Sequence, residues 1–82
     1  MYFVEFTKTA EKQLNKLPNN IKIRLLNVLD RIKIRPFHFI KRKEGSPYFI
    51  IRFGEHRAIL DINIDKKNIY VIEVGHRKNI YY

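Results

Sequence analysis

Apolar residues recur with two different periods along this chain, and the change of period separates a helical part from a sheet part. Between positions 8 and 32 they return every three or four positions, as on one face of an amphipathic helix. In positions 2–6, and again from position 48 onward, short runs rich in β-branched and aromatic residues are typical of strands. The pattern therefore predicts a strand, a helical part and then a series of strands.

Two helices joined by a short turn are expected in the helical part. Thr7 offers a hydroxyl that can cap the first helix. Pro18 and the two asparagines after it separate the helices, and Pro36 ends the second helix at or before Arg35. The predicted apolar stripes comprise Ala10, Leu14 and Leu17 in the first helix, and Ile21, Leu25, Leu26, Val28, Leu29 and Ile32 in the second.

Three antiparallel strands are expected after the helices, in residues 48–53, 57–64 and 69–74. Gly54 and Glu55 form the tight turn of the first hairpin, with glycine at the position that needs a positive φ. Residues 65–67 form the loop of the second hairpin. Because each helix has a single apolar stripe, both helices need a sheet to cover them.

The register of these strands follows from keeping the apolar side chains on one face. Arg52 then opposes Arg57, because a shift by one residue would bury both arginines and expose aliphatic residues. In the second hairpin Leu60 opposes Ile72, and Arg77 follows on the arginine face. The apolar face toward the helices is predicted to comprise Phe49, Ile51, Ala58, Leu60, Ile62, Ile64, Tyr70, Ile72 and Val74, with Ile69 and Val71 on the opposite face.

The predicted fold is α+β with the element order β-α-α-β-β-β. The N-terminal strand joins the antiparallel meander, and the helical hairpin packs on one face of a four-stranded antiparallel sheet. With 82 residues, the chain is expected to form one domain, residues 1–82.

Composition and charge narrow the function classes. The net charge is +9, which indicates a polyanionic partner, although a generally basic surface would give the same value. The chain has no cysteine and three well-separated histidines, so we expect no metal site and no cofactor. No apolar run approaches the roughly 20 residues of a membrane span, and the N-terminus lacks the features of a signal peptide, so a cytoplasmic protein without membrane contacts is expected.

Two groups of basic residues are candidate binding sites. Lys41, Arg42 and Lys43 form a basic loop that suits contacts with a nucleic-acid backbone, or is an ordinary solvated loop. The arginine face suits a phosphate or carboxylate group, because a guanidinium binds such groups through two parallel hydrogen bonds. The alternative is a solvated face on which Asp61 and Glu73 neutralise the arginines.

The C-terminal residues add candidate chemistry. Tyr81 and Tyr82 either cover the sheet edge or provide a stacking platform for a base and a phenol near the arginines. His76 carries a proton that can be exchanged near neutral pH, as general acid–base catalysis requires. A continued strand would point His76 at the core, whereas a break at Gly75 leaves its direction open.

Three strings of this sequence carry a family resemblance: T-K-T-A-E-K-Q-L-N-K-L-P, R-F-G-E-H-R-A-I-L-D-I and V-I-E-V-G-H-R-K-N-I-Y. Together they resemble the RelE/ParE superfamily of type II toxins. The resemblance covers nearly the whole chain. It implies a cytoplasmic toxin that is paired with a cognate acidic, RelB-like antitoxin covering the basic face. The RelE-like branch further implies an mRNA interferase that enters the ribosomal A site, contacts mRNA and rRNA, and cuts the mRNA without a metal.

In that mechanism the ribose 2′-oxygen attacks the adjacent phosphate, leaving a 2′,3′-cyclic phosphate and a 5′-hydroxyl. By resemblance, Arg57 stabilises the transition state, Arg77 assists the leaving 5′-oxygen, and Arg52 lies near the 2′-oxygen and binds the nucleic acid. Tyr81 matches the C-terminal tyrosine that stacks and orients the substrate, with Tyr82 one position away.

The resemblance leaves the proton acceptor open, because a guanidinium stays protonated far above neutral pH and arginine is therefore a poor base. His76 or Tyr81 is the expected substitute. Ile50 stands where RelE-like nucleases often have a second basic residue, which favours a catalytically weak RNA-binding relic. A ParE-like toxin, which binds and inhibits DNA gyrase without being an enzyme, is the main alternative, although Arg52, Arg57 and Arg77 together favour the nuclease.

Overall fold

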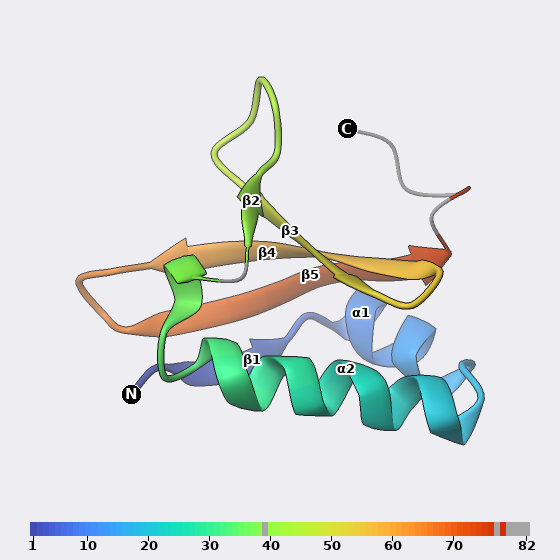
Figure 1. Ribbon diagram of the computed structural model, residues 1–82. Coiled ribbons are helices and arrows are strands. Elements are labelled where there is room, and N and C mark those ends of the chain that lie inside the picture. Colours follow the sequence, from blue (N-terminus) through green and yellow to red (C-terminus); the bar gives the residue numbers. More distant parts are fainter. Residues whose placement is uncertain (39, 77, 79–82) are drawn as a thin grey trace.

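The computed structural model describes residues 1–38, 40–76 and 78, and forms a single sheet with two helices against one face (Figure 1). The predicted α+β class and element order are confirmed. The elements are β1 (Phe3–Phe6), α1 (Lys8–Asn15), α2 (Asn19–Ile32), a short 3-10 helix (Pro36–His38), β2 (Lys41–Arg42), β3 (Phe49–Phe53), β4 (His56–Asn63) and β5 (Asn68–His76).

The sheet has five strands in the order β1-β5-β4-β3-β2, and it is mixed. The expectation of a four-stranded, wholly antiparallel sheet is wrong on two points: β1 pairs with β5 in parallel, and β2 adds a strand at the other edge. The sequence gives no sign of β2, because a two-residue strand of lysine and arginine has no apolar alternation. Its pairing arises only because the chain folds back on β3.

The helix stripes bury as predicted, with one exception. Leu25, Leu29 and Ile32 of α2 are buried against the sheet, whereas Leu26 is 45% exposed. Successive residues of an α-helix turn by about 100°, so Leu26 points away from the line of Leu25 and Leu29. The predicted cap is confirmed, because the amide of Ala10 donates to Thr7 Oγ1 at 3.1 Å.

The β3–β4 hairpin has the predicted register, with Arg52 directly opposite Arg57. Its turn begins at Gly54, which has a φ of 67° as expected. An added Cβ at this glycine would lie 2.5 Å from a guanidinium nitrogen of Arg24. Glycine is therefore favoured here by the backbone conformation, whereas the flexible end of the exposed Arg24 side chain can move away from an added Cβ.

The β4–β5 register differs from the prediction in the half next to the loop. Asn63 pairs with Asn68 across a four-residue loop, and Leu60 pairs with Val71 instead of Ile72. Beyond this point Ile59 pairs with Glu73, so Ile72 is an extra residue in β5 that forms a β-bulge and restores the predicted register.

The bulge exchanges the faces of the first residues of β5. Ile69 and Val71 are fully buried beneath the helices, whereas Tyr70 is 42% exposed on the opposite face and Ile72 packs there with Ile50 and Ile59. The predicted faces of Ile69, Tyr70, Val71 and Ile72 are therefore wrong, and Ile64, predicted on the apolar face, is exposed in the loop. Burying two β-branched residues while the tyrosine hydroxyl stays accessible is physically favourable.

Helix α1 stabilises the bulge where β1 has ended. The hydroxyl of Thr7 donates to the carbonyl of Ile72 at 2.8 Å, and the amide of Val74 donates to the side-chain oxygen of Gln13 at 2.7 Å. These bonds satisfy backbone groups that no neighbouring strand reaches on this side of β5. No helix in the part of the chain that the structure describes is long and apolar enough to cross a membrane.

Candidate functional site

The β2–β3 hairpin rises from the sheet on the side opposite α1 and α2, and forms a wall beside the open face (Figure 1). Its tip is a well-bonded turn. The Lys43 amide donates to the Tyr48 carbonyl at 2.8 Å, the Ser46 amide to the Lys43 carbonyl at 3.1 Å, and the Tyr48 amide to Ser46 Oγ at 3.1 Å. Gly45, with a φ of 70°, allows the chain to reverse.

A pocket of about 260 Å³ lies between this wall and the sheet. The lining residues are Lys41, Arg42 and Glu44 from the hairpin, and Ile50, Arg52 and Arg57 from β3 and β4. Two residues of the basic loop and the arginine pair, which the sequence presents as separate candidates, therefore line one pocket. Lys43, the third basic residue of the loop, is half-buried and does not line the pocket.

The pocket is electrostatically suited to an anion. Its lining carries four cationic side chains and one carboxylate, a formal charge of four minus one, or +3. Arg52 and Arg57 are paired across β3 and β4, and their like charges repel each other. An anion between them would offset this repulsion. Arg52 is exposed, whereas Arg57 is half-buried and its Nε is shielded from solvent. The low-dielectric surroundings of Arg57 strengthen its interaction with a bound charge.

Arg42 is positioned by its neighbours on the hairpin. Its Nε donates to the Ser46 carbonyl at 3.4 Å, and its guanidinium carbon lies 6.0 Å from the centroid of the Phe49 ring. The Phe37 ring packs edge-to-face against the Phe49 ring, with the two centroids 5.6 Å apart. The wall is thus anchored by aromatic contacts below the charged tip.

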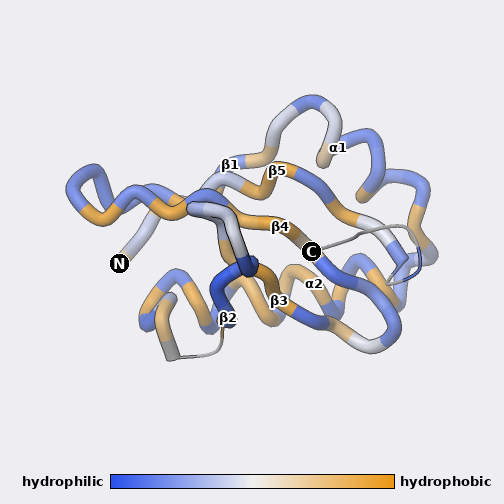
Figure 2. The backbone as a smooth tube through the Cα atoms, turned by 90° about the horizontal axis from the view of Figure 1, so that it is seen from above, coloured by the Kyte–Doolittle hydropathy of each residue, from blue (hydrophilic) through white to orange (hydrophobic). Residues whose placement is uncertain are grey.

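An apolar cluster of three isoleucines continues the open face beyond the arginines. Ile50 and Ile59 are 8% and 7% exposed, and Ile72, supplied by the bulge, packs against them. Seen from above, hydrophilic positions gather on β2 and around the β3–β4 turn, whereas the middle of β4 is hydrophobic (Figure 2). The face therefore changes from strongly basic to apolar along β4.

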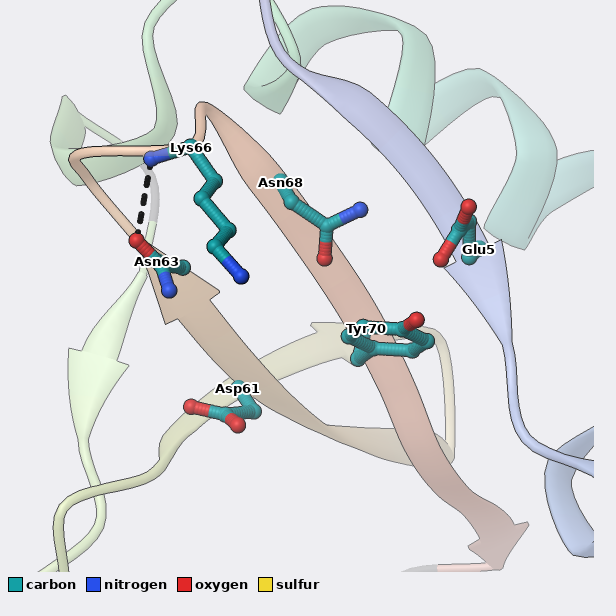
Figure 3. A pocket seen from close by; sticks show the side chains of 6 residues that line it. All are labelled: Glu5, Asp61, Asn63, Lys66, Asn68 and Tyr70. Atoms are coloured by element: carbon teal, nitrogen blue, oxygen red, sulfur yellow. Dashed lines mark hydrogen bonds between the residues drawn. The ribbon is translucent and has the colours of Figure 1, made fainter.

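A second pocket, of about 320 Å³, lies at the far end of the same face and is lined by Glu5, Asp61, Asn63, Lys66, Asn68 and Tyr70 (Figure 3). The Tyr70 hydroxyl points toward Glu5. A hydrogen bond to this carboxylate, together with its charge, raises the pKa of Tyr70 above the ordinary value of 10.0. The carboxylates of Glu5 and Asp61 repel phosphate, so this end does not suit a nucleic-acid backbone.

His76 does not join the arginines. Strand β5 continues through Gly75 to His76, which pairs with His56, and the two imidazole centroids are 5.3 Å apart. His56 in turn stacks on the buried ring of Phe53 at 5.7 Å, so both histidines lie on the helix side of the sheet. Burial, and next the proximity of His76, lower the pKa of His56 below 6.5, and Glu55 opposes this shift.

The remaining candidates, Arg77, Tyr81 and Tyr82, lie outside the described residues. Among residues 1–38, 40–76 and 78, no group of three or more potential metal ligands occurs. One lining residue was missed on the sequence, namely Glu44. The loop sequence K-R-K-E-G-S-P carries no signal for its role, because only the rise of the hairpin brings this carboxylate to the arginines.

Comparisons with known proteins concern the chain as a whole. The model of the ParE toxin of type II toxin–antitoxin systems, parDE, matches residues 4–81. Toxin RelG of Mycobacterium tuberculosis is 30% identical over 83 residues, covering 98% of this chain and 95% of the relative. A chain of the toxin–antitoxin complex RelBE2 from Mycobacterium tuberculosis is similar, with a TM-score of 0.82, 29% identity, and coverage of 93% of this chain and 98% of that chain. A chain of the RelB–RelE antitoxin–toxin complex from Methanococcus jannaschii has a TM-score of 0.74 and 30% identity, with 93% of each chain covered.

Proposed function

Because this chain belongs to the ParE toxin family of type II toxin–antitoxin systems, we propose that it inhibits translation as an endoribonuclease that cuts mRNA on the ribosome. The resemblance to the RelE/ParE superfamily is confirmed by the family match and by the RelG and RelBE2 relatives. The nuclease activity, its dependence on the ribosome and its place in the cytoplasm are parts of the proposal.

The observation that carries the proposal is the direct opposition of Arg52 and Arg57 in a pocket that also contains Lys41 and Arg42. Four cations around about 260 Å³ suit one phosphate group of a single-stranded RNA and the backbone next to it. Guanidinium groups that are fixed before the substrate binds stabilise the negative charge that develops on the phosphate during reaction. Such a site needs no metal to supply that charge.

The proposed chemistry is attack of the ribose 2′-oxygen on the adjacent phosphorus. The bond from phosphorus to the 5′-oxygen breaks, and the products are a 2′,3′-cyclic phosphate and a 5′-hydroxyl. Arg57, which is half-buried, contacts the non-bridging oxygens, and Arg52 lies toward the 2′-oxygen. Arg77 and Tyr81 keep the roles that the resemblance implies, at the leaving oxygen and in stacking.

The proposed protein partner is an acidic antitoxin similar to RelB. The RelBE2 and RelB–RelE relatives are toxin–antitoxin complexes. The +9 net charge of this chain, to which the four cations of the arginine pocket contribute, complements an acidic segment that covers this pocket.

Primer extension on a translated mRNA tests the nuclease. Wild-type protein should create new 5′ ends within codons at the ribosomal A site, and Arg57→Ala should reduce their rate of formation by about 100- to 1,000-fold. Arg31→Ala is the matched control, because it removes an exposed arginine of α2 on the opposite side of the sheet. The absence of new ends with wild-type protein would refute the nuclease.

Inhibition of DNA gyrase is the second candidate, and the match to the ParE toxin family favours it. In this case the arginine pocket binds an acidic protein surface and performs no chemistry. A supercoiling assay separates the two functions: full gyrase activity in the presence of excess toxin excludes the second candidate.

A further inference from the structure

Glu44 is the residue of the arginine pocket for which the proposed chemistry has no role so far. It lies in the turn between β2 and β3, at the top of the wall that rises beside the sheet (Figure 1). Its neighbours Lys43, Ser46 and Tyr48 are tied by three hydrogen bonds of 2.8 to 3.1 Å. These bonds fix the backbone of the turn, and Glu44 lines the same cavity as Arg52 and Arg57.

The reaction needs a proton acceptor that the other lining residues do not supply. A guanidinium has only hydrogen-bond donors, so Arg42, Arg52 and Arg57 do not offer a proton acceptor. The side chain of Ile50 has no polar atom, and the ammonium group of Lys41 likewise has only donors. His76 lies on the other side of the sheet. Of the described residues that line the pocket, Glu44 alone carries a carboxylate.

The negative charge of Glu44 is unexpected in a pocket that binds phosphate. A carboxylate repels the phosphates of RNA, so on binding grounds alone it weakens the affinity of this site for its ligand. A proton acceptor, in contrast, must carry an available lone pair next to the attacking hydroxyl. Glu44 and the two arginines line the same pocket, so that the carboxylate can take the proton while the guanidinium groups stabilise the phosphate.

We infer that Glu44 is the general base of the proposed nuclease and removes the proton of the attacking 2′-hydroxyl. As the O–H bond breaks, the proton passes to a carboxylate oxygen of Glu44 and the 2′-oxygen forms its bond to phosphorus. The bond from phosphorus to the 5′-oxygen breaks, its electron pair stays on that oxygen, and water supplies the proton that completes the 5′-hydroxyl. Glu44 afterwards returns its proton to solvent. The inference rests on the nuclease function proposed above.

Single-turnover cleavage of ribosome-bound mRNA by Glu44→Gln tests the role. The variant keeps the size of the side chain and loses the proton acceptor, so cleavage should slow by about 100- to 10,000-fold. Binding of a short single-stranded RNA, measured by fluorescence anisotropy, should be unchanged or tighter, because a negative charge has been removed. Slower chemistry together with equal or tighter binding is opposite to what a purely electrostatic role predicts.

Two further variants complete the test. Asp65→Asn removes an exposed carboxylate from the other hairpin and should leave cleavage unchanged, whereas Glu44→Asp should retain part of the activity. Cleavage by Glu44→Gln at the wild-type rate would overturn the inference while leaving the nuclease intact. Absence of cleavage by wild-type protein would overturn both.

Discussion

Replacing Thr7 by alanine should lower the free energy of unfolding by about 2 kcal/mol, because one hydroxyl makes two hydrogen bonds. Thr7 Oγ1 accepts from the amide of Ala10 at 3.1 Å, and loss of such a helix cap costs about 1 kcal/mol. The same hydroxyl donates to the carbonyl of Ile72 at 2.8 Å, and loss of a hydrogen bond of this kind costs about 1 kcal/mol more.

Urea unfolding followed by circular dichroism measures this change, and thermal unfolding should show a decrease in Tm of roughly 8 to 16 °C. Thr9→Ala is the matched control, because Thr9 is exposed on the same helix and alanine is the better helix former. Thr7→Ser should recover most of the stability. If Thr7→Ala and Thr9→Ala both change stability by less than about 0.5 kcal/mol, the hydroxyl does not support the cap and the bulge as argued.

The link between Thr7 and the functional face gives this prediction a second consequence. The bulge at Ile72 restores the register in which Gly75 lies opposite Arg57. Loss of the hydrogen bond from Thr7 to the carbonyl of Ile72 should therefore accelerate hydrogen exchange at the amide of Val74, which is next to the bulge and bonded to Gln13. Unchanged exchange at this amide would show that α1 does not hold the bulge.

Three further predictions concern pH, the turns and salt. The pKa of His56 is lower in the folded than in the unfolded protein, so its contribution to stability is fully present above the unfolded value of 6.5 and is lost as pH falls through and below that value. The urea midpoint should therefore decrease between pH 7.5 and 5.5, about one unit either side of 6.5. A flat pH profile, or a decrease that His56→Asn leaves unaltered, would contradict this origin. Gly54→Ala and Gly45→Ala should destabilise the protein by similar amounts in urea unfolding, because both glycines have positive φ and the side chain nearest to a new Cβ at Gly54 is the flexible end of Arg24. Unchanged stability of both variants would argue against this backbone origin. The double alanine variant of β2 should reduce the slope of log K against log salt for single-stranded RNA by about 1.4, since each phosphate contact contributes about 0.7, and an unchanged slope would remove β2 from the binding surface.

Periodicity and parity were reliable where one principle acted on neighbouring residues. The stripe of Leu25, Leu29 and Ile32, the cap at Thr7 and the glycine turn at Gly54 follow from the geometry of a helix or a tight turn. These features depend on residues a few positions apart, so the linear sequence contains what decides them.

The same reasoning failed where two strands compete for one register. The predicted pairing of Leu60 with Ile72 assumed a ladder without interruption, but β5 contains an extra residue. A bulge allows both halves of the hairpin to bury their β-branched residues, Ile69 and Val71 in one half and Val74 in the other. No local pattern reveals it, because its supports, Thr7 and Gln13, are about 60 positions away in the chain.

The sequence by itself determined the types of the main elements, the opposition of Arg52 and Arg57, and the strong positive charge that indicates a polyanionic partner. Adjacent-strand parity fixes that opposition, because the alternative register would bury two guanidinium groups. Only the tertiary structure decided that β1 runs parallel to β5, that the β2–β3 hairpin rises over the sheet, and that Glu44 lines the arginine pocket. These features depend on how distant segments pack against one another, and the free energy that selects them comes from contacts that no short stretch of sequence contains.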